Sequence, residues 1–180
     1  KEGGNAIVAA VAVGFALAVV HPGAGNIGGG GFMVIRFANG ESTAIDFRET
    51  APQLANKDMF LDEDGNVIKG KSWNTSYAVG VPGTVAGLGF VHRKYGTQRW
   101  YKLLQPAIRM AKFGHNINYL NFSLLNAPYY SRFLSKDLET KKIFYKDDAF
   151  KLGEVFIQKE LAGTLSRIAQ YGYQEFYTGK

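Results

Sequence analysis

The sequence predicts an α+β chain whose strands lie near the N-terminus, and three observations lead to that prediction. Residues 3–20 form a nearly continuous run of Ala, Val and other apolar residues, which favours a helix packed on several sides. Two β-prone runs, 32–37 and 41–47, flank Asn39 and Gly40, a pair typical of tight hairpin turns. Most of the remaining chain consists of amphipathic stretches that end at a glycine, which indicates helices.

The expected elements follow one another along the chain. The first helix ends at Pro22, because proline removes a backbone donor and cannot continue the helix, and His21 is expected to cap it. A second turn is expected over 62–66 (DEDGN), followed by a short strand, a Pro-Gly corner and a helix within 78–96. Further helices are expected over 98–114, where Pro106 would kink the helix or split it in two, over 116–135, and over 155–172.

Composition limits the class of protein. A chain of 180 residues with 46% hydrophobic content is long enough for one domain with a core. The net charge of +6 does not come from a basic block, because the densest charged stretch, 136–148, carries four bases and four acids. This mixture favours a solvated face over a nucleic-acid-binding surface. The apolar run 6–20 has 15 residues, which is short for a membrane span, so none is expected in this chain.

No metal site or cofactor is expected. The chain has no cysteine, which excludes disulfides, thiolate metal sites and a cysteine nucleophile. His21, His92 and His115 stand apart from one another, without the spacing of a metal-binding motif.

The glycine-rich stretch 21–32 (HPGAGNIGGGGF) contains G-x-G-x-x-G over 23–28, the spacing of a dinucleotide-binding loop. Such a loop needs a strand before the glycines and a helix after them, so that the helix N-terminus faces the pyrophosphate. Here a helix is expected before the glycines and a strand after them. The glycines therefore indicate a close approach of backbone, either at a tight crossover, which the residues alone favour, or at the floor of a substrate pocket.

Arg48 is the candidate binding residue. In the stretch 44–50 (AIDFRET), the alternation of a strand places Arg48 on the same face as Ala44 and Asp46, at the strand's end. A guanidinium there can reach into a cleft and bind a carboxylate through two parallel hydrogen bonds, with Asp46 orienting it. The alternative, which the residues alone favour, is a structural ion pair between Arg48 and either Asp46 or Glu49.

Three blocks in the same order, 3–36, 44–52 and 80–88, resemble the large subunit of a γ-glutamyltranspeptidase, and looser similarity continues to residue 180. The resemblance implies an N-terminal-nucleophile hydrolase with a layered αββα sandwich, of which this chain supplies helices and a few strands. Residues 1–180 would form a single segment of the large subunit, without its leader or the segment that ends at the cleavage point. A small subunit from the same precursor would complete the domain.

The resemblance also implies an activity. Such enzymes move the γ-glutamyl group of glutathione or related amides to water, an amino acid or a peptide, through an acyl-enzyme on the N-terminal Thr of the small subunit. No catalytic residue is then expected in this chain, which alone would be inactive. The family's substrate-binding Arg matches Arg48, which would bind the donor α-carboxylate with Asp46 and Glu49 in support. The resemblance implies no cofactor, and it implies a periplasmic or secreted location.

Other functions stay open at this point. A related amide acylase, such as a cephalosporin acylase, or a poly-γ-glutamate transpeptidase would share the fold. A non-catalytic interaction module could keep the fold and lose the processing. A nucleotide-binding protein is a third alternative, which a strand before Gly23 would favour.

Overall fold

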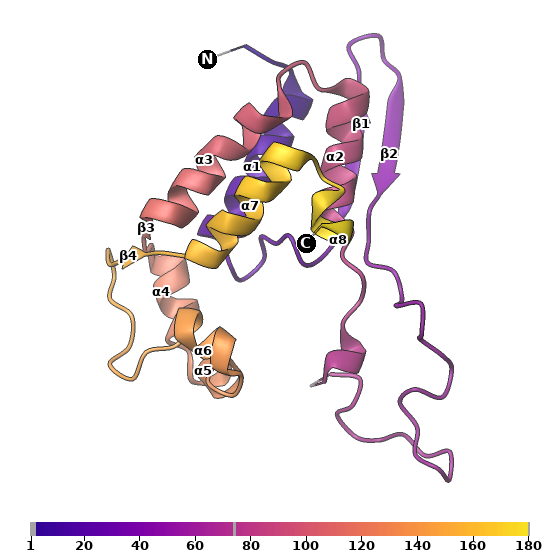
Figure 1. Cartoon of the computed structure of the whole chain (residues 1–180), viewed down its shortest axis with the longest axis vertical. Helices are drawn as coiled ribbons and strands as arrows, with labels where there is room; N and C mark the ends of the chain where they lie inside the picture. The colour runs from indigo at the N-terminus through magenta and orange to yellow at the C-terminus, as the bar shows by residue number, and fades with distance from the viewer. Residues whose placement is uncertain (1–2, 74, 180) are drawn as a thin grey trace. The chain divides into compact units, whose positions relative to one another are not determined.

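The computed structural model describes residues 3–73 and 75–179 (Figure 1). They form two compact units: a helical unit, made of the described residues within 1–26 and 88–180, and a hairpin unit of residues 27–87. Helices and a few short strands alternate along the chain, so the predicted α+β class is confirmed.

In the helical unit, helix α1 (Ala6–Val20) begins where the side chain of Asn5 accepts a hydrogen bond from the backbone N–H of Val8. It ends at His21, whose backbone N–H donates to the carbonyl of Leu17, so the predicted cap is confirmed. The burial is one-sided: Val11 and Phe15 are fully buried, while positions such as Val13 are exposed. Among the described residues, α1 therefore packs on one side only, and the prediction of a helix packed on several sides is wrong.

Helix α3 (Trp100–Phe113) contacts both α1 and α7 (Lys159–Tyr171) (Figure 1). The indole of Trp100 joins the three helices, because its ring meets Phe15 of α1 edge-to-face at 5.4 Å and its N–H donates to the carbonyl of Ile168 in α7. Pro106 lies inside α3 without splitting it, contrary to one of the two expectations. The buried face of α3 continues past the proline through Ala107 and Ala111, and this packing offsets the lost backbone donor.

Helix α2 (Thr84–Tyr95) begins after the Pro-Gly corner, as predicted, and is followed by Gly96. The chain after α3 holds shorter elements than the sequence predicts. The expected helix over 116–135 is two helices, α4 (Tyr119–Leu125) and α5 (Pro128–Leu134), because Pro128 takes the first position of a new helix. Helix α6 (Leu138–Phe144) follows, and α8 (Glu175–Thr178) comes after α7.

Residues 155–156, expected to begin a helix, form strand β4 (Val155–Phe156), which pairs with β3 (His115–Asn116). Behind this pair, Ile117, Leu125, Phe150 and Phe156 make a small apolar core of their own. Asn121 connects α4 to α1, since its buried amide donates to the carbonyl of Val20.

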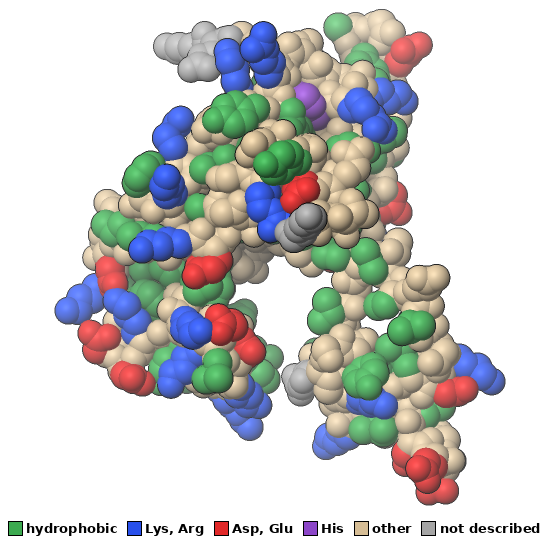
Figure 2. All heavy atoms as spheres, in the orientation of Figure 1, with side chains coloured by type: hydrophobic (Ala, Val, Ile, Leu, Met, Phe, Trp, Pro, Cys, Tyr) green, Lys and Arg blue, Asp and Glu red, His purple; other side chains and the backbone are tan. Residues whose placement is uncertain are grey.

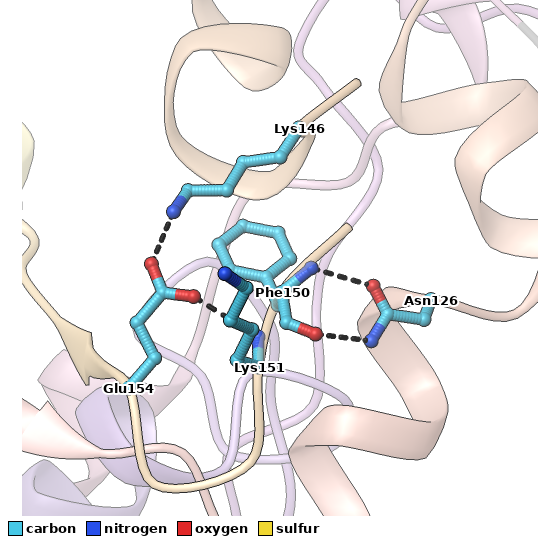
Figure 3. A network of polar contacts seen from close by, with 5 residues as sticks. All are labelled: Asn126, Lys146, Phe150, Lys151 and Glu154. Atoms are coloured by element: carbon cyan, nitrogen blue, oxygen red, sulfur yellow. Dashed lines mark hydrogen bonds and ion pairs between the residues drawn. The ribbon is translucent and has the colours of Figure 1, made fainter. Parts of the chain in front are cut away.

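A polar network holds the loop between α6 and β4 (Figure 3). The side-chain amide of Asn126 makes two hydrogen bonds with the backbone of Phe150, each of 2.9 Å. The Glu154 carboxylate pairs with the Lys146 ammonium and accepts from the backbone N–H of Lys151. The Lys146 hydrogen bond, followed by that of Lys151, lowers the pKa of Glu154. The loop is thus held by its own polar contacts as well as by the burial of Phe150.

The hairpin unit begins with strands β1 (Phe32–Arg36) and β2 (Ser42–Asp46), which pair antiparallel with Phe32 opposite Asp46. Gly40 has φ of +89° in the connecting turn, so the predicted hairpin is confirmed. The predicted turn at 62–66 is also present, closed by a bridge between Leu61 and Val67. The short strand expected before the Pro-Gly corner is instead a 3₁₀ turn, η1 (Ser76–Ala78), and a single bridge between Thr50 and Val81.

Across residues 3–73 and 75–179, strands form two separate two-stranded sheets. None of the helices in these residues is long and apolar enough to cross a bilayer. Figure 2 shows Lys and Arg side chains interspersed with Asp and Glu rather than gathered in one basic block. The described part of the chain also contains no group of His, Asp or Glu side chains arranged to hold a metal ion.

Candidate functional site

Arg48 lies at the exit of the hairpin. Strand β2 ends at Asp46, but Phe47 still pairs with Gly31, through an N–H bond of 2.9 Å and a reciprocal bond of 3.3 Å. Arg48 is thus the first residue beyond this pairing, and its side chain is exposed. This is the place at the strand's end that the sequence predicts.

Within the described part of the chain, Arg48 does not form the ion pair that the alternative interpretation predicts. Its backbone N–H donates to Oδ1 of Asp46 at 2.9 Å, which fixes the backbone of Arg48 and not its guanidinium. Among the described residues, no ion pair joins the guanidinium to Asp46 or Glu49. The guanidinium carbon lies 5.9 Å from the ring centroid of Phe32, a cation–π distance. Its five donors therefore keep the capacity to bind an external anion.

The alternation expected along 44–49 holds only as far as Arg48. Asp46 and Arg48 are exposed, while Ile45 and Phe47 are half-buried. Glu49 breaks the pattern and is exposed as well. The backbone leaves the hairpin there, because Thr50 pairs with Val81 through two hydrogen bonds of 2.8 and 3.1 Å.

Arg48 and Glu49 line an open cleft of about 550 Å³ within the hairpin unit. Met59, Phe60 and Tyr77 line the same cleft and supply apolar surface. A cation beside an apolar wall suits a ligand with a carboxylate at one end and a less polar body. The sequence did not predict these three wall residues, which come from irregular segments that carry no periodic pattern.

Two glycines border the backbone that carries Arg48. A Cβ on Gly30 would lie 2.6 Å from the carbonyl oxygen of Phe47 and 2.7 Å from the Cα of Arg48. A Cβ on Gly83 would overlap the same carbonyl oxygen and lie 2.8 Å from the oxygen of Arg48. The glycine-rich stretch is thus both a helix-to-strand crossover and a surface packed against the candidate binding residue.

The order of elements rejects the dinucleotide alternative. Helix α1 precedes the glycines and strand β1 follows them, which is the reverse of what the motif requires. The backbone N–H groups of Gly83 and Thr84, at the start of α2, donate to the carbonyl of Gly29 at 2.8 and 3.0 Å.

The histidines serve separate structural roles in the helical unit. His92 Nε2 lies 2.7 Å from the carbonyl of Gln98. His115 is the unusual one, because both ring nitrogens are buried and have no hydrogen-bond partner among the described residues. Its burial lowers its pKa. The sequence around His115 contains no pattern that predicts this buried environment.

Comparison with known proteins gives matches over the whole chain. The sequence model of the family described as Gamma-glutamyltranspeptidase matches residues 1–180. The Glutathione hydrolase proenzyme of Escherichia coli (strain K12) is 50% identical over 180 residues, which cover 99% of this chain and 31% of that protein. The chain therefore spans about a third of the length of this curated relative.

Solved structures give the same result. The crystal structure of Helicobacter pylori gamma-glutamyltranspeptidase superposes with a TM-score of 0.94 at 50% identity, covering 99% of this chain and 51% of that one. The transpeptidase enzyme CapD of Bacillus anthracis gives a TM-score of 0.78 at 34% identity, covering 99% and 54%.

Proposed function

Because the chain belongs to the γ-glutamyltranspeptidase family, we propose that the full-length protein hydrolyses or transfers the γ-glutamyl group of glutathione and related amides. In this proposal, residues 1–180 are a single segment of the large subunit, and a small subunit from the same precursor completes an N-terminal-nucleophile hydrolase fold. The word proenzyme in the name of the E. coli relative supports the precursor. We also propose that the protein is exported to the periplasm or secreted, and only the family resemblance supports this location.

This chain's part in the reaction is to bind the donor. The observation that carries this assignment is that Arg48 lies exposed on a cleft, with no carboxylate partner among the described residues. A donor's α-carboxylate would accept two parallel hydrogen bonds from this guanidinium. Glu49, on the same cleft, is suited to the donor's α-ammonium group, and Asp46 fixes the backbone between the strand and Arg48.

Bond breaking belongs to the small subunit. An N-terminal Thr there would attack the γ-carbonyl with its own α-amino group as base, and preorganised donors would stabilise the oxyanion. The acyl-enzyme would then pass the γ-glutamyl group to water or to an acceptor amine. Arg48 contributes by holding the far end of the glutamyl group, so that the γ-carbonyl meets the nucleophile in a fixed orientation.

Arg48→Lys in the full-length protein tests the assignment. Loss of the bidentate geometry should raise the KM for a chromogenic γ-glutamyl anilide by about 10- to 100-fold, the range for hydrogen bonds between charged groups. Self-cleavage of the precursor should continue, because it does not use the donor's carboxylate. Arg36→Lys, at an exposed position on β1, is the matched control and should leave the KM unchanged. An unchanged KM in Arg48→Lys would remove Arg48 from the site.

A poly-γ-glutamate donor is the second candidate, which the exposed guanidinium of Arg48 favours. Such a polymer also presents α-carboxylates along its length, so Arg48 would serve either donor. Relative rates on a γ-glutamyl anilide and on an oligo-γ-glutamate of several residues separate the two. A precursor that is neither processed nor active on either donor would favour a non-catalytic module, and activity on a different amide alone would favour an acylase.

A further inference from the structure

We propose that Gly30 and Gly83 are positioning residues for Arg48, which hold the backbone of the Phe47–Arg48 peptide between two chain segments. This inference rests on the proposed function of Arg48. The two glycines come from different segments, the glycine-rich stretch before β1 and the corner before α2.

The distances show why neither position has room for a side chain. At Gly30, a Cβ would meet the Phe47 carbonyl oxygen at 2.6 Å, the Arg48 Cα at 2.7 Å and the Glu49 nitrogen at 2.8 Å. At Gly83, a Cβ would overlap the Phe47 carbonyl and come within 2.8 Å of the Arg48 oxygen. All of these atoms are backbone, so no rotation of a side chain can relieve the contacts. Both segments thus approach the same peptide as closely as backbone packing allows.

The two segments are also joined to each other. The carbonyl of Gly29 accepts from the N–H groups of Gly83 and Thr84, so the residue next to Gly30 is tied to Gly83. On the other side of Gly30, Gly31 exchanges backbone hydrogen bonds with Phe47. The peptide carrying Arg48 is therefore held by hydrogen bonds and by van der Waals contact at the same time.

The ring of Phe47 adds a second contact on the face opposite Arg48. A Cβ on Gly87 would overlap Cγ of this ring, and a Cβ on Gly31 would lie 3.0 Å from its Cε2. Because successive side chains point to opposite faces of an extended chain, fixing the Phe47 ring also fixes the direction in which Arg48 leaves the backbone.

This arrangement has a consequence for donor binding. An arginine side chain has four rotatable bonds, and each one it must order on binding weakens affinity. A backbone fixed in advance leaves only this side-chain ordering to be lost on binding, so disturbing the backbone should weaken donor binding and raise the KM.

The test uses full-length protein with Gly30→Ala, Gly83→Ala, Arg48→Lys and the double variant Gly30→Ala/Arg48→Lys. The readouts are kcat and KM for the γ-glutamyl anilide. Each glycine variant should raise the KM by about 10-fold or more, with a much smaller change in kcat. In the Arg48→Lys background, Gly30→Ala should add little further loss, because it acts through Arg48.

Three results would overturn the inference. The first is a folded, self-cleaved Gly30→Ala protein with the original KM. The second is a loss of equal size in both backgrounds, which would show that Gly30 acts independently of Arg48. The third is an unchanged KM in Arg48→Lys alone, which would defeat the proposed function itself and leave nothing for the glycines to position.

Gly31→Ala is a milder variant that can be tested if Gly30→Ala or Gly83→Ala does not fold. It requires the Phe47 ring to move by only a few tenths of an ångström. It should still process itself and should show a smaller rise in KM of the same kind. An unchanged KM in this folded variant would also count against the inference. Gly163→Ala, in α7, is the matched control, since a Cβ there would meet no atom within 4 Å, and it should behave like the unchanged protein.

Discussion

The carboxylate of Asp46 accepts a hydrogen bond from the backbone N–H of Arg48 at 2.9 Å, and so it fixes this residue without pairing with its guanidinium. An acid placed two residues before an arginine would ordinarily be expected to pair with its charge. Here the geometry separates the two functions: the acid shapes the turn and the guanidinium stays available to a ligand.

That relationship predicts different outcomes for two substitutions of Asp46. Asp46→Asn keeps an oxygen that can accept from Arg48, whereas Asp46→Ala does not. Both remove the charge, so only the hydrogen bond differs between them. Asp46→Ala should raise the donor KM by about 2- to 10-fold more than Asp46→Asn, which corresponds to one net hydrogen bond. Equal KM values for the two variants would show that this hydrogen bond does not contribute to donor binding.

The packing around Gly30 predicts a difference in stability within one short stretch. A Cβ on Gly28 would meet no atom within 4 Å, while a Cβ on Gly30 would meet backbone at 2.6 Å. Gly30→Ala should therefore destabilise by about 1–3 kcal/mol, and Gly28→Ala should not. Thermal unfolding of the two full-length variants measures this difference. If the two lost equal stability, the clash inferred at Gly30 would be wrong.

The amide of Asn126 provides a stability test in the helical unit. Asn126→Ala leaves the backbone N–H and carbonyl of Phe150 without their partners (Figure 3). Because these groups lie beside a buried side chain, the expected loss is about 1–3 kcal/mol. Asn126→Asp should also lose stability, since it keeps the acceptor for the Phe150 N–H but places a second carboxylate oxygen against the Phe150 carbonyl. Chemical unfolding of the full-length protein would reveal whether the loop is held in this way.

Burial of His115 predicts a dependence of stability on pH. Burial lowers the pKa of the folded imidazole from its ordinary value of 6.5, so the unfolded chain binds the proton more readily. Stability from this group is therefore fully present above pH 6.5 and is lost as the pH falls below it. His115→Phe, which keeps a ring against Phe156, should reduce the fall in Tm between pH 7.5 and 5.5. An identical fall in both proteins would exclude His115 as its source.

Local signals predicted several elements well. Asn39 and Gly40 predict a tight turn by their conformational preferences alone, and the hairpin is present because its two strands need only each other. Helix ends at His21, Gly96 and Gly172 likewise follow from residues within one turn of the end.

Features that the sequence left open or missed depend on contacts between distant residues. Pro106 does not split α3, because packing of the face that contains Ala107 and Ala111 holds the helix together on both sides of the proline. Val155 and Phe156 are apolar enough for the start of a helix but pair with β3, some 40 positions earlier in the sequence. At the site, the sequence predicted the place of Arg48, but the contacts of Gly30 and Gly83 with its backbone depend on three segments that meet only in the folded chain.

Recognition of the α-carboxylate by Arg48 is measured most directly by the preference of the full-length protein for a donor that carries this group. The ratio of kcat/KM for a γ-glutamyl anilide to that for its α-carboxamide analogue should be large in the unchanged protein. In Arg48→Gln the ratio should fall by about 10-fold or more, because the group that distinguishes the two donors is gone. A ratio that stays the same in Arg48→Gln would contradict a binding role for Arg48, since recognition of the carboxylate would then lie elsewhere.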